Sequence, residues 1–493
     1  MKFLNESEYK LNDCKWLNRL PDTWDSKRLK YVSKVKPSNV DKKTEENEIP
    51  VSLCNYNEVY KNDFIDSYLT FMEASASSEE IAKFQIIKDD VIITKDSETP
   101  EEIALPAYVV ENLPNTLCGY HLSLIRTDKN VLSGSYLFRL FQSKQFNAQF
   151  TVAANGITRF GLDTYSIKNA VVALPSLPEQ QTIAKFLDYK TTQIDELIEK
   201  KEQLLKLLEE KRIALITNAV TGKLSTSPPW RGLRGGSQLD KHNNVTMKPS
   251  GISWLGNIPS NWYVCQLKYV AKISYGIGGE IDKSITKGVR LLSLPNVSKE
   301  GDLLLDEENY IELSEDEKES LLLKEGDLLF NWRNGSSDHL GKTVIINSSD
   351  EFTHVSFLLR IRFKKKFDSR YFKYLLHGFR MTRYFSSSKA GVNNTFNLSE
   401  LSELRIIVPT KYDQKNISDY LDLEIDRILK LKSTIINAIE KLKEYRTSLI
   451  TSAVTGKIDL RNWSSPTSLS FIRACPDSSG RGTEGEVKDD KLS

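Results

Sequence analysis

The sequence predicts an α+β protein with two similar globular parts and two long helices. Three observations support this fold class. The chain repeats itself, each repeat ends in a long heptad pattern, and strand-like runs precede that pattern. At 493 residues the chain is also longer than one hydrophobic core usually serves. Apolar residues make up 39% of it, enough to fill two cores.

The repeat is visible in two motifs. WLNRLPDTWDSKRLKYVSKV, beginning at Trp16, returns as WLGNIPSNWYVCQLKYVAKI at Trp254, 238 residues later. ITNAVTGK (216–223) returns as ITSAVTGK (450–457), 234 residues later. Because the two offsets nearly agree across the whole span, we interpret the pattern as a tandem duplication of one fold.

Each copy has the same internal order. Strand-like runs such as DVIIT (90–94) and DLLF (327–330) are followed by a Pro-containing strand end and then by a long helix. The boundaries that we expect are a first globular domain (1–176), a helix (177–224), a Gly- and Asn-rich linker (225–250), a second globular domain (251–410), a helix (411–457) and a disordered tail (458–493).

Apolar residues recur in steps of three and four along both helices, which predicts a coiled-coil seam. In the second helix the seam is Ile428, Leu431, Ile435, Ala438, Leu442, Tyr445 and Leu449. In the first it is Ile194, Leu197, Lys201, Leu204, Leu208, Lys211 and Leu215, with Ile198 and Leu205 beside it. We expect the two helices to pair; the alternative is that each packs only on its own domain.

The length of the helices suggests a purpose for the pair. A helix of about 40 residues spans roughly 60 Å at ~1.5 Å per residue. DNA-binding dimers read half-sites about 34–36 Å apart on one face of the duplex. Two paired helices of this length can therefore act as a spacer between two reading domains.

Composition narrows the class of protein without naming it. No run of 18 apolar residues and no signal peptide is present, so we expect a soluble, cytoplasmic protein without a membrane partner. The five cysteines lack metal-ligand spacing, so we expect no metal. Net charge is only +2, but basic residues gather in two runs, Lys27, Arg28, Lys30, Lys34 and Lys36, and Arg360, Arg362, Lys364, Lys365 and Lys366. Each run is either a solvated face or a phosphate-binding surface.

Two loops in each copy carry the donors and acceptors that reading of base edges requires. In the first copy the candidate DNA-binding residues are Lys95, Asp96 and Ser97 in one loop and Asn155, Thr158 and Arg159 in the other. In the second copy they are Asn331, Arg333, Asn334 and Ser336 in one loop, braced by Trp332, and Asn393 and Asn394 in the other.

Each candidate has a structural alternative. Asn334–Gly335 is also an ordinary turn signal, and Lys95 and Asp96 can form a surface ion pair. His121 and His354 precede strands, where a hydrogen-bonded structural histidine is the favoured interpretation. Since the matched loops differ in nearly every polar residue, the two copies are expected to read different sequences.

Catalytic interpretations are weak. SPPW (227–230) resembles the active-site tetrad of amino-methyltransferases but lies in the linker, without a cofactor loop upstream. Asp89, Asp90 and Lys95 have no matching cluster in the second copy to support a nuclease metal centre. TGK at 221–223 and 455–457 lacks the rest of a phosphate-binding loop. We therefore expect no catalytic residue in this chain.

A family resemblance follows from longer segments. LPSLPEQQTIAKFLD (174–188), with the EKR of 210–212, resembles the specificity subunits of type I restriction-modification enzymes. VSLCNYNEVYKNDF (51–64) and LFNWRNGS (329–336) are similar to parts of their target recognition domains. Tyr412–Gln414 departs from the usual Leu-x-Glu-Gln form.

The resemblance implies two target recognition domains that read an asymmetric bipartite site on double-stranded DNA. It implies helices that pair antiparallel with pseudo-twofold symmetry. Two methyltransferase subunits and the restriction (motor-nuclease) subunits would be partners, and S-adenosylmethionine, Mg²⁺ and ATP would be bound by those subunits, with no cofactor here. The alternative that remains open is a coiled-coil scaffold that joins two protein-binding domains and does not contact DNA.

Overall fold

The computed structural model describes residues 2–4, 6–11, 16–223, 246–252, 255–279, 284–333, 339–382, 384–387 and 395–464. They belong to two compact units, one built from residues 1–201 and 437–493 and the other from residues 202–436. The first unit is discontinuous in sequence because the end of the chain packs with its beginning. The two long helices, α6 (Leu177–Val220) and α11 (Lys411–Val454), each contribute residues to both units.

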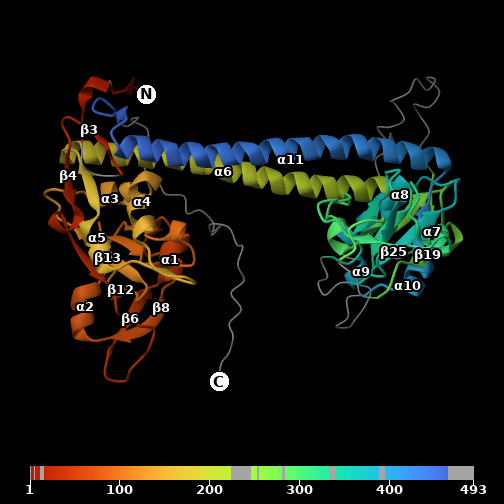
Figure 1. Ribbon diagram of the computed structural model, residues 1–493, viewed down its shortest axis with the longest axis horizontal. Coiled ribbons are helices and arrows are strands. Elements are labelled where there is room, and N and C mark those ends of the chain that lie inside the picture. Colours follow the sequence, from red (N-terminus) through yellow and green to blue (C-terminus); the bar gives the residue numbers. More distant parts are fainter. Residues whose placement is uncertain are drawn as a thin grey trace. The chain divides into compact units, whose positions relative to one another are not determined.

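Mixed sheets and short helices form the globular part of the first unit (Figure 1). Its strands are β1 (Lys2–Phe3), β2 (Tyr9–Leu11), β3 (Arg19–Pro21), β4 (Asp25–Arg28), β5 (Ser33–Pro37), β6 (Ile49–Cys54), β7 (Phe64–Ile65), β8 (Met72–Ala76), β9 (Val91–Thr94), β10 (Asp96–Ser97), β11 (Pro106–Val109), β12 (Thr116–Cys118), β13 (Leu122–Thr127), β14 (Phe160–Gly161), β15 (Val171–Leu174) and β27 (Ile458–Asp459). Its short helices are α1 (Tyr56–Lys61), α2 (Ser78–Phe84), α3 (Gly134–Phe141), α4 (Lys144–Ala153) and α5 (Thr164–Asn169).

The second unit repeats much of this order. Its strands are β16 (Met247–Pro249), β17 (Asn257–Pro259), β18 (Tyr263–Gln266), β19 (Ala271–Tyr275), β20 (Val289–Leu292), β21 (Tyr310–Ile311), β22 (Leu328–Asn331), β23 (Thr343–Ile345), β24 (Phe352–His354), β25 (Leu358–Phe363) and β26 (Arg405–Val408). Its short helices are α7 (Glu315–Leu321), α8 (Ser369–Met381), α9 (Tyr384–Ser387) and α10 (Leu398–Glu403).

The sheets confirm the duplication in most of their strands. The order β5-β13-β9-β11-β7 in the first unit corresponds to β19-β25-β22-β23 in the second. The order β12-β6-β8 corresponds to β24-β20-β21, with one parallel and one antiparallel pairing in each. The central strands β9 and β22 are buried at every position, as their unbroken apolar runs predict. The fold class is therefore the predicted α+β repeat.

The start of each long helix is fixed by the same two contacts. Trp24 Nε1 donates to Glu179 at 3.0 Å, and Trp262 Nε1 donates to Asp413 at 3.0 Å. The buried amide of Gln180 donates to the Pro175 carbonyl, and Gln414 donates to that of Pro409 in the same way. The departure from the family pattern at 412–414 thus keeps the contacts, because Asp413 replaces Glu179 as the acceptor.

The end of each long helix packs in the core that belongs to the other copy. Ile450 and Val454 of α11 lie in the first unit's core, and Ile216 and Val220 of α6 lie in the core of the second. Two residues after the end of each helix stands a glycine with φ of +72°, Gly456 after α11 and Gly222 after α6. In both cases the following lysine N–H bonds back to the last turn, a Schellman motif that explains the recurring TGK.

The seam of the helix pair differs from the predicted one at every second position. In α11, Ile428 and Ile435 are buried as predicted, whereas Leu431 and Tyr445 are 46% and 49% exposed. In α6, Ile194 and Leu208 are buried, whereas Leu197 and Leu204 are exposed. The more enclosed side chains belong instead to the next residues along the chain, namely Ile198, Leu205 and Arg212 in α6 and Lys432, Ile439 and Arg446 in α11. At Lys432 and Arg446 the prediction was wrong because it selected the apolar neighbours Leu431 and Tyr445 instead of charged residues.

Ion pairs on the two helices explain how charged residues occupy a seam. Arg446 Nε lies 2.9 Å from Asp195 Oδ1, and Lys432 Nζ lies 2.7 Å from Glu209 Oε2. Glu209 comes later in α6 than Asp195, whereas its partner Lys432 comes earlier in α11 than Arg446, the partner of Asp195. The two sequence separations are equal. The two helices therefore run antiparallel, as the resemblance implied.

The equivalent arginines Arg446 and Arg212, 234 residues apart, also reach the globular parts. Arg446 Nη2 lies 3.0 Å from Asp63 Oδ2 in the first unit. Arg212 Nη2 donates to the Glu300 carbonyl at 3.0 Å in the second. The arginine that ends EKR (210–212) and the arginine that ends the equivalent EYR (444–446) thus each join the helix of one copy to the globular part of the other.

The ordered chain continues past the predicted boundary at 458. Ile458 and Asp459 pair with β1, and Trp463 packs edge-on against Phe186 with ring centroids 5.5 Å apart. Most of the predicted linker and the rest of the tail lie outside the described residues, as does the SPPW motif.

We predict that Ile435→Ala lowers the free energy of unfolding by about 2 kcal/mol or more, because Ile435 is 5% exposed in the seam. The matched control is Leu431→Ala one turn away, which should change it by less than about 1 kcal/mol because that side chain is already half exposed. Urea unfolding followed by circular dichroism compares them. Equal losses would mean that the predicted rather than the observed seam is correct.

Two buried histidines predict loss of stability in acid. Burial lowers the pKa of His354 to about 3, and burial together with Arg212 lowers that of His377 to about 3. An unfolded histidine titrates near 6.5. Between these values only the unfolded chain binds the proton, so stability is full above about pH 6.5 and falls as pH drops toward 3. His354→Cys, which copies Cys118 at the equivalent strand position, should flatten the dependence of the unfolding midpoint on pH; an unchanged slope would contradict this.

Candidate nucleic-acid interface

The fold brings the two predicted loops of the first copy together. Residues 95–97 follow β9 directly, and Asp96 and Ser97 pair with Gly161 and Phe160 in a two-stranded ladder. Asn155 bridges to Gly161 on the other side of the same turn. The segment 155–159 between them is exposed throughout, including Thr158 and Arg159. Two loops about sixty residues apart in sequence therefore form one surface.

Within this surface the predicted residues have different environments. Lys95 Nζ donates to the Ser38 carbonyl at 3.1 Å and lies 4.6 Å from the centre of the Tyr120 ring. Asp96 Oδ2 lies 2.7 Å from His121 Nδ1, and Arg159 Nη2 approaches the same nitrogen at 3.4 Å. Ser97 is buried and donates to the Thr99 carbonyl, so its side chain supports the loop rather than facing outward.

The second copy assembles its loops in the same way. Arg333 forms an isolated bridge with Thr395, which joins the segment after β22 to the segment before α10. Asn331 is 1% exposed, and its Oδ1 accepts from the Arg333 N–H at 3.2 Å. Asn331 is thus buried, whereas Arg333 is exposed. The remaining candidates of this copy, Asn334, Ser336, Asn393 and Asn394, lie outside the described residues.

Sequence reasoning undervalued the residues just before β13 and β25. Tyr120 and Phe357 are exposed aromatic side chains. His121 takes part in the Asp96 pair, and the Arg333 guanidinium lies 5.9 Å from the centre of the Phe357 ring. The available signal was an aromatic residue one or two positions before a buried strand that pairs with β9 or β22.

The two basic runs are only partly surface. Arg362 and Asp327 form a pair at 2.5 Å, and Arg360 Nη1 donates to the Ser320 carbonyl at 2.9 Å. Arg126 and Asp90 form the equivalent of the first pair in the first unit at 2.7 Å. Lys27, Arg28, Lys30 and Lys34 are exposed and form the surface part of the first run. In the second run, by contrast, Arg360 and Arg362 are engaged in contacts with neighbouring segments of the fold and stabilise it.

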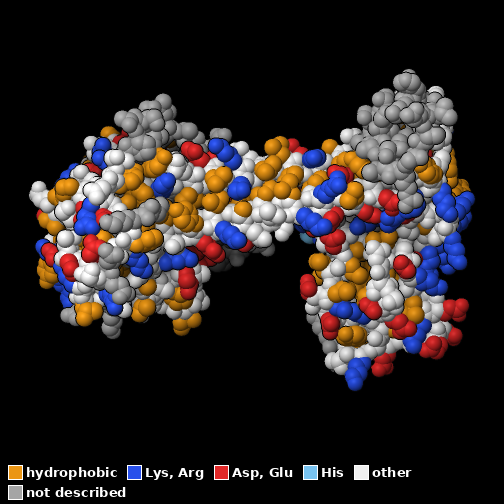
Figure 2. Space-filling view, turned by 90° about the horizontal axis from the view of Figure 1, so that it is seen from above, with side chains coloured by type: hydrophobic (Ala, Val, Ile, Leu, Met, Phe, Trp, Pro, Cys, Tyr) orange, Lys and Arg blue, Asp and Glu red, His pale blue; other side chains and the backbone are white. Residues whose placement is uncertain are grey.

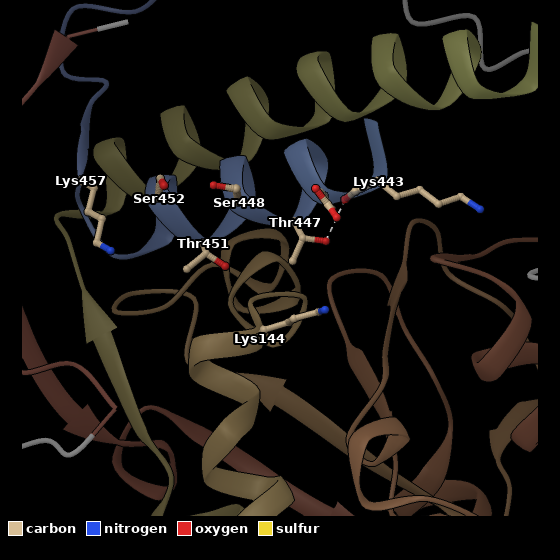
Figure 3. A pocket seen from close by; sticks show the side chains of 8 residues that line it. Lys144, Lys443, Thr447, Ser448, Thr451, Ser452 and Lys457 are labelled. Atoms are coloured by element: carbon tan, nitrogen blue, oxygen red, sulfur yellow. Dashed lines mark hydrogen bonds between the residues drawn. The ribbon is translucent and has the colours of Figure 1, made fainter. Parts of the chain in front are cut away.

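A separate cavity of about 420 Å³ lies in the first unit beside the end of α11 (Figure 3). It is lined by Lys144, Lys443, Glu444, Thr447, Ser448, Thr451, Ser452 and Lys457. None of the predicted DNA-binding residues lines it. Thr451 accepts from the Ser143 hydroxyl at 3.2 Å, so the cavity lies where α4 begins against α11.

Neither a metal cluster nor a membrane span is found in the part of the chain that the structure describes. No group of three or more His, Cys, Asp or Glu side chains is placed to hold a metal ion there. In the same residues, no helix is both long enough and apolar enough to cross a membrane.

The fold and the paired loops define a duplicated binding protein with two modules of one kind and different surface residues. The model of the type I restriction modification DNA specificity domain matches residues 21–207 and again residues 259–441. These matches cover most of the chain. The chain belongs to this family of type I restriction-modification specificity subunits.

Individual relatives agree with this assignment. The chain is 23% identical over 457 residues to the type I restriction enzyme MjaVIII specificity subunit of Methanocaldococcus jannaschii, covering 90% of this chain and 95% of that protein. It is 23% identical over 380 residues to the StySPI specificity subunit of Salmonella potsdam, covering 76% of each.

Solved structures show the same fold. A chain from work on complex assembly and conformational transition of the type I R-M system aligns with a TM-score of 0.66 and 17% identity, over 89% of this chain and 99% of that one. The HsdS subunit from Thermoanaerobacter tengcongensis aligns with a TM-score of 0.50 and 16% identity, over 89% of this chain and 98% of that one.

Substitution of Asn331 and of Arg333 should have different effects on the free energy of unfolding. Asn331→Ala should lower the free energy of unfolding by about 1–3 kcal/mol, because it removes a buried acceptor of a backbone N–H. Arg333→Ala, at an exposed position, should change it by less than about 0.5 kcal/mol. Thermal unfolding of both variants measures this, and a larger loss in Arg333→Ala would assign that arginine a structural role.

Proposed function

We propose that this chain is the non-catalytic DNA-reading subunit of a type I restriction-modification complex in the cytoplasm, and that each unit reads one part of an asymmetric bipartite site. The observation that carries the proposal is the pair of loop surfaces after β9 and β22. They occupy equivalent places in a duplicated fold, yet they present Asp96 with His121 in one unit and Arg333 with Phe357 in the other. Similar folds with unlike reading residues suit two different half-sites.

The side chains of these surfaces suit both parts of DNA recognition. Lys95, Arg159 and Arg333 can contact phosphates or the acceptors of guanine. Asn155 and Thr158 add exposed polar groups beside Arg159. Buried Ser97 and Asn331 would hold the loops in place. Asn334, Ser336, Asn393 and Asn394 remain proposed ligands.

We place the partner subunits on the long helices. The sequence put Leu197, Leu204, Leu431 and Tyr445 in the seam, but all are 41–49% exposed beside it. Each helix therefore has apolar residues on a second face, and hydrophobic side chains are visible along the helices in Figure 2. A face of this kind suits helices of another protein. In this proposal two methyltransferase subunits bind there and the restriction subunits join them, and those partners bind S-adenosylmethionine, Mg²⁺ and ATP.

Salt dependence and base selection together test the proposal. The full-length chain, assembled with its methyltransferase subunits, should select two separated and different motifs from a pool of randomised duplexes. The logarithm of its affinity should fall with that of salt by about 0.9 per phosphate contacted. Selection of one contiguous motif would contradict the bipartite reading. Failure to bind duplex DNA at any salt concentration would favour the scaffold alternative.

A further inference from the structure

The surface after β9 contains a histidine whose orientation is fixed on one side. His121 Nδ1 lies 2.7 Å from Asp96 Oδ2, and its side chain is 32% exposed. Tyr120 packs edge-on against the imidazole with ring centroids 4.7 Å apart. Within the described residues no group hydrogen-bonds Nε2. One ring nitrogen is therefore held by the protein, and the other is available to a ligand.

The chemistry of the partner determines what Nε2 can do. An ionised carboxylate only accepts hydrogen bonds, so the 2.7 Å contact with Asp96 requires that Nδ1 carry the proton. Arg159 Nη2, at 3.4 Å, then makes no hydrogen bond to that nitrogen, because both groups are donors. In the neutral ring Nε2 is then a lone-pair acceptor. Acceptors in the major groove select bases that present an exocyclic amino group, namely adenine N6 and cytosine N4. The arginine and lysine side chains nearby, Arg159 and Lys95, are donors and cannot make this selection.

The second unit supports a reading role for this position. Thr94 pairs with Leu122 in the first unit, and Asn331 pairs with Leu358 in the second. Counting from these pairs, Asp96 corresponds to Arg333 and His121 corresponds to Phe357. An acid with histidine in one copy is thus replaced by a cation with an aromatic ring in the other. A pair that served only to hold the shared fold would not need such different chemistry.

We propose that His121, oriented by Asp96, is a specificity-determining residue of the first unit and accepts a hydrogen bond from the amino group of adenine or cytosine. This inference rests on the proposed DNA-reading function. It assigns a chemical class of base, one with an exocyclic amino group, to one base position of the half-site that the first unit reads. It gives Asp96 a positioning role, in place of the direct contact with a base that the sequence suggested.

The test is base selection by the full-length chain assembled with its methyltransferase subunits, using duplexes randomised at every position. In His121→Phe, preference for adenine or cytosine should fall about tenfold at one position of one half-site. His121→Gln keeps an acceptor and should retain most of the preference. The matched control is Phe357→Leu, which should leave this position unchanged.

A second variant separates positioning from simple structural support. In Asp96→Asn the amide can donate to Nδ1, which places the ring proton on Nε2 and makes it a donor. Preference at the same position should then move toward guanine or thymine, which present acceptors. A merely structural role would reduce binding to all duplexes alike, and unfolding midpoints of each variant detect a damaged fold.

The outcomes distinguish this inference from the proposed function. If the unaltered protein selects no motif, the proposed function fails. If it selects a motif that His121→Phe reproduces unchanged, only the role of His121 is overturned. A uniform loss of affinity in Asp96→Asn without a change of preferred base would overturn the positioning role of Asp96.

Discussion

The interlocking of each helix end with the other copy of the fold is the constraint on which the architecture depends. A Cβ added to Gly456 would lie 2.3 Å from Pro21 Cγ, and one added to Gly222 would lie 2.5 Å from Pro259 Cδ. Both glycines also have positive φ, which a residue with a Cβ adopts only with strain. The two motifs that reveal the duplication, WLxx(L/I)PxxW and TGK, therefore contact each other, always across the two copies.

The same contacts across the two copies explain why two arginines of the long helices are enclosed. Arg446 lies on the helix of the second copy and contacts Asp63 in the globular part of the first copy. Arg212 lies on the helix of the first copy and contacts the Glu300 carbonyl in the globular part of the second. Arg446 faces both Asp63 and Asp195, and its pKa is raised by these acids despite its burial. Buried arginines of this kind are stable only with such partners. The apolar contacts at each helix end and the arginine contacts therefore both attach the helix of one copy to the globular part of the other.

The duplication, the long helices and the strand order could be predicted because they depend on patterns that repeat. The seam was half wrong because Lys432 and Arg446 occupy it, and an apolar pattern cannot reveal a buried ion pair. The sequence named the two loops separately, and only the structure shows that they adjoin, since residues 95–97 and 155–161 meet at one ladder. The roles within them could not be read from sequence: nothing local distinguishes buried Asn331 from exposed Arg333 two residues later.

The charges along α6 recur at a spacing that leaves the alignment of the two helices ambiguous. Asp188, Asp195, Glu202 and Glu209 follow one another every seven residues. If α11 slid one heptad toward the start of α6, Arg446 would meet Asp188 and Lys432 would meet Glu202, so the ion pairs between the two helices would not oppose this slip. The glycine caps against Pro21 and Pro259 do not allow it, because each cap fits only one site. The correct alignment is therefore set at the ends of the helices, where each glycine fits closely against one proline.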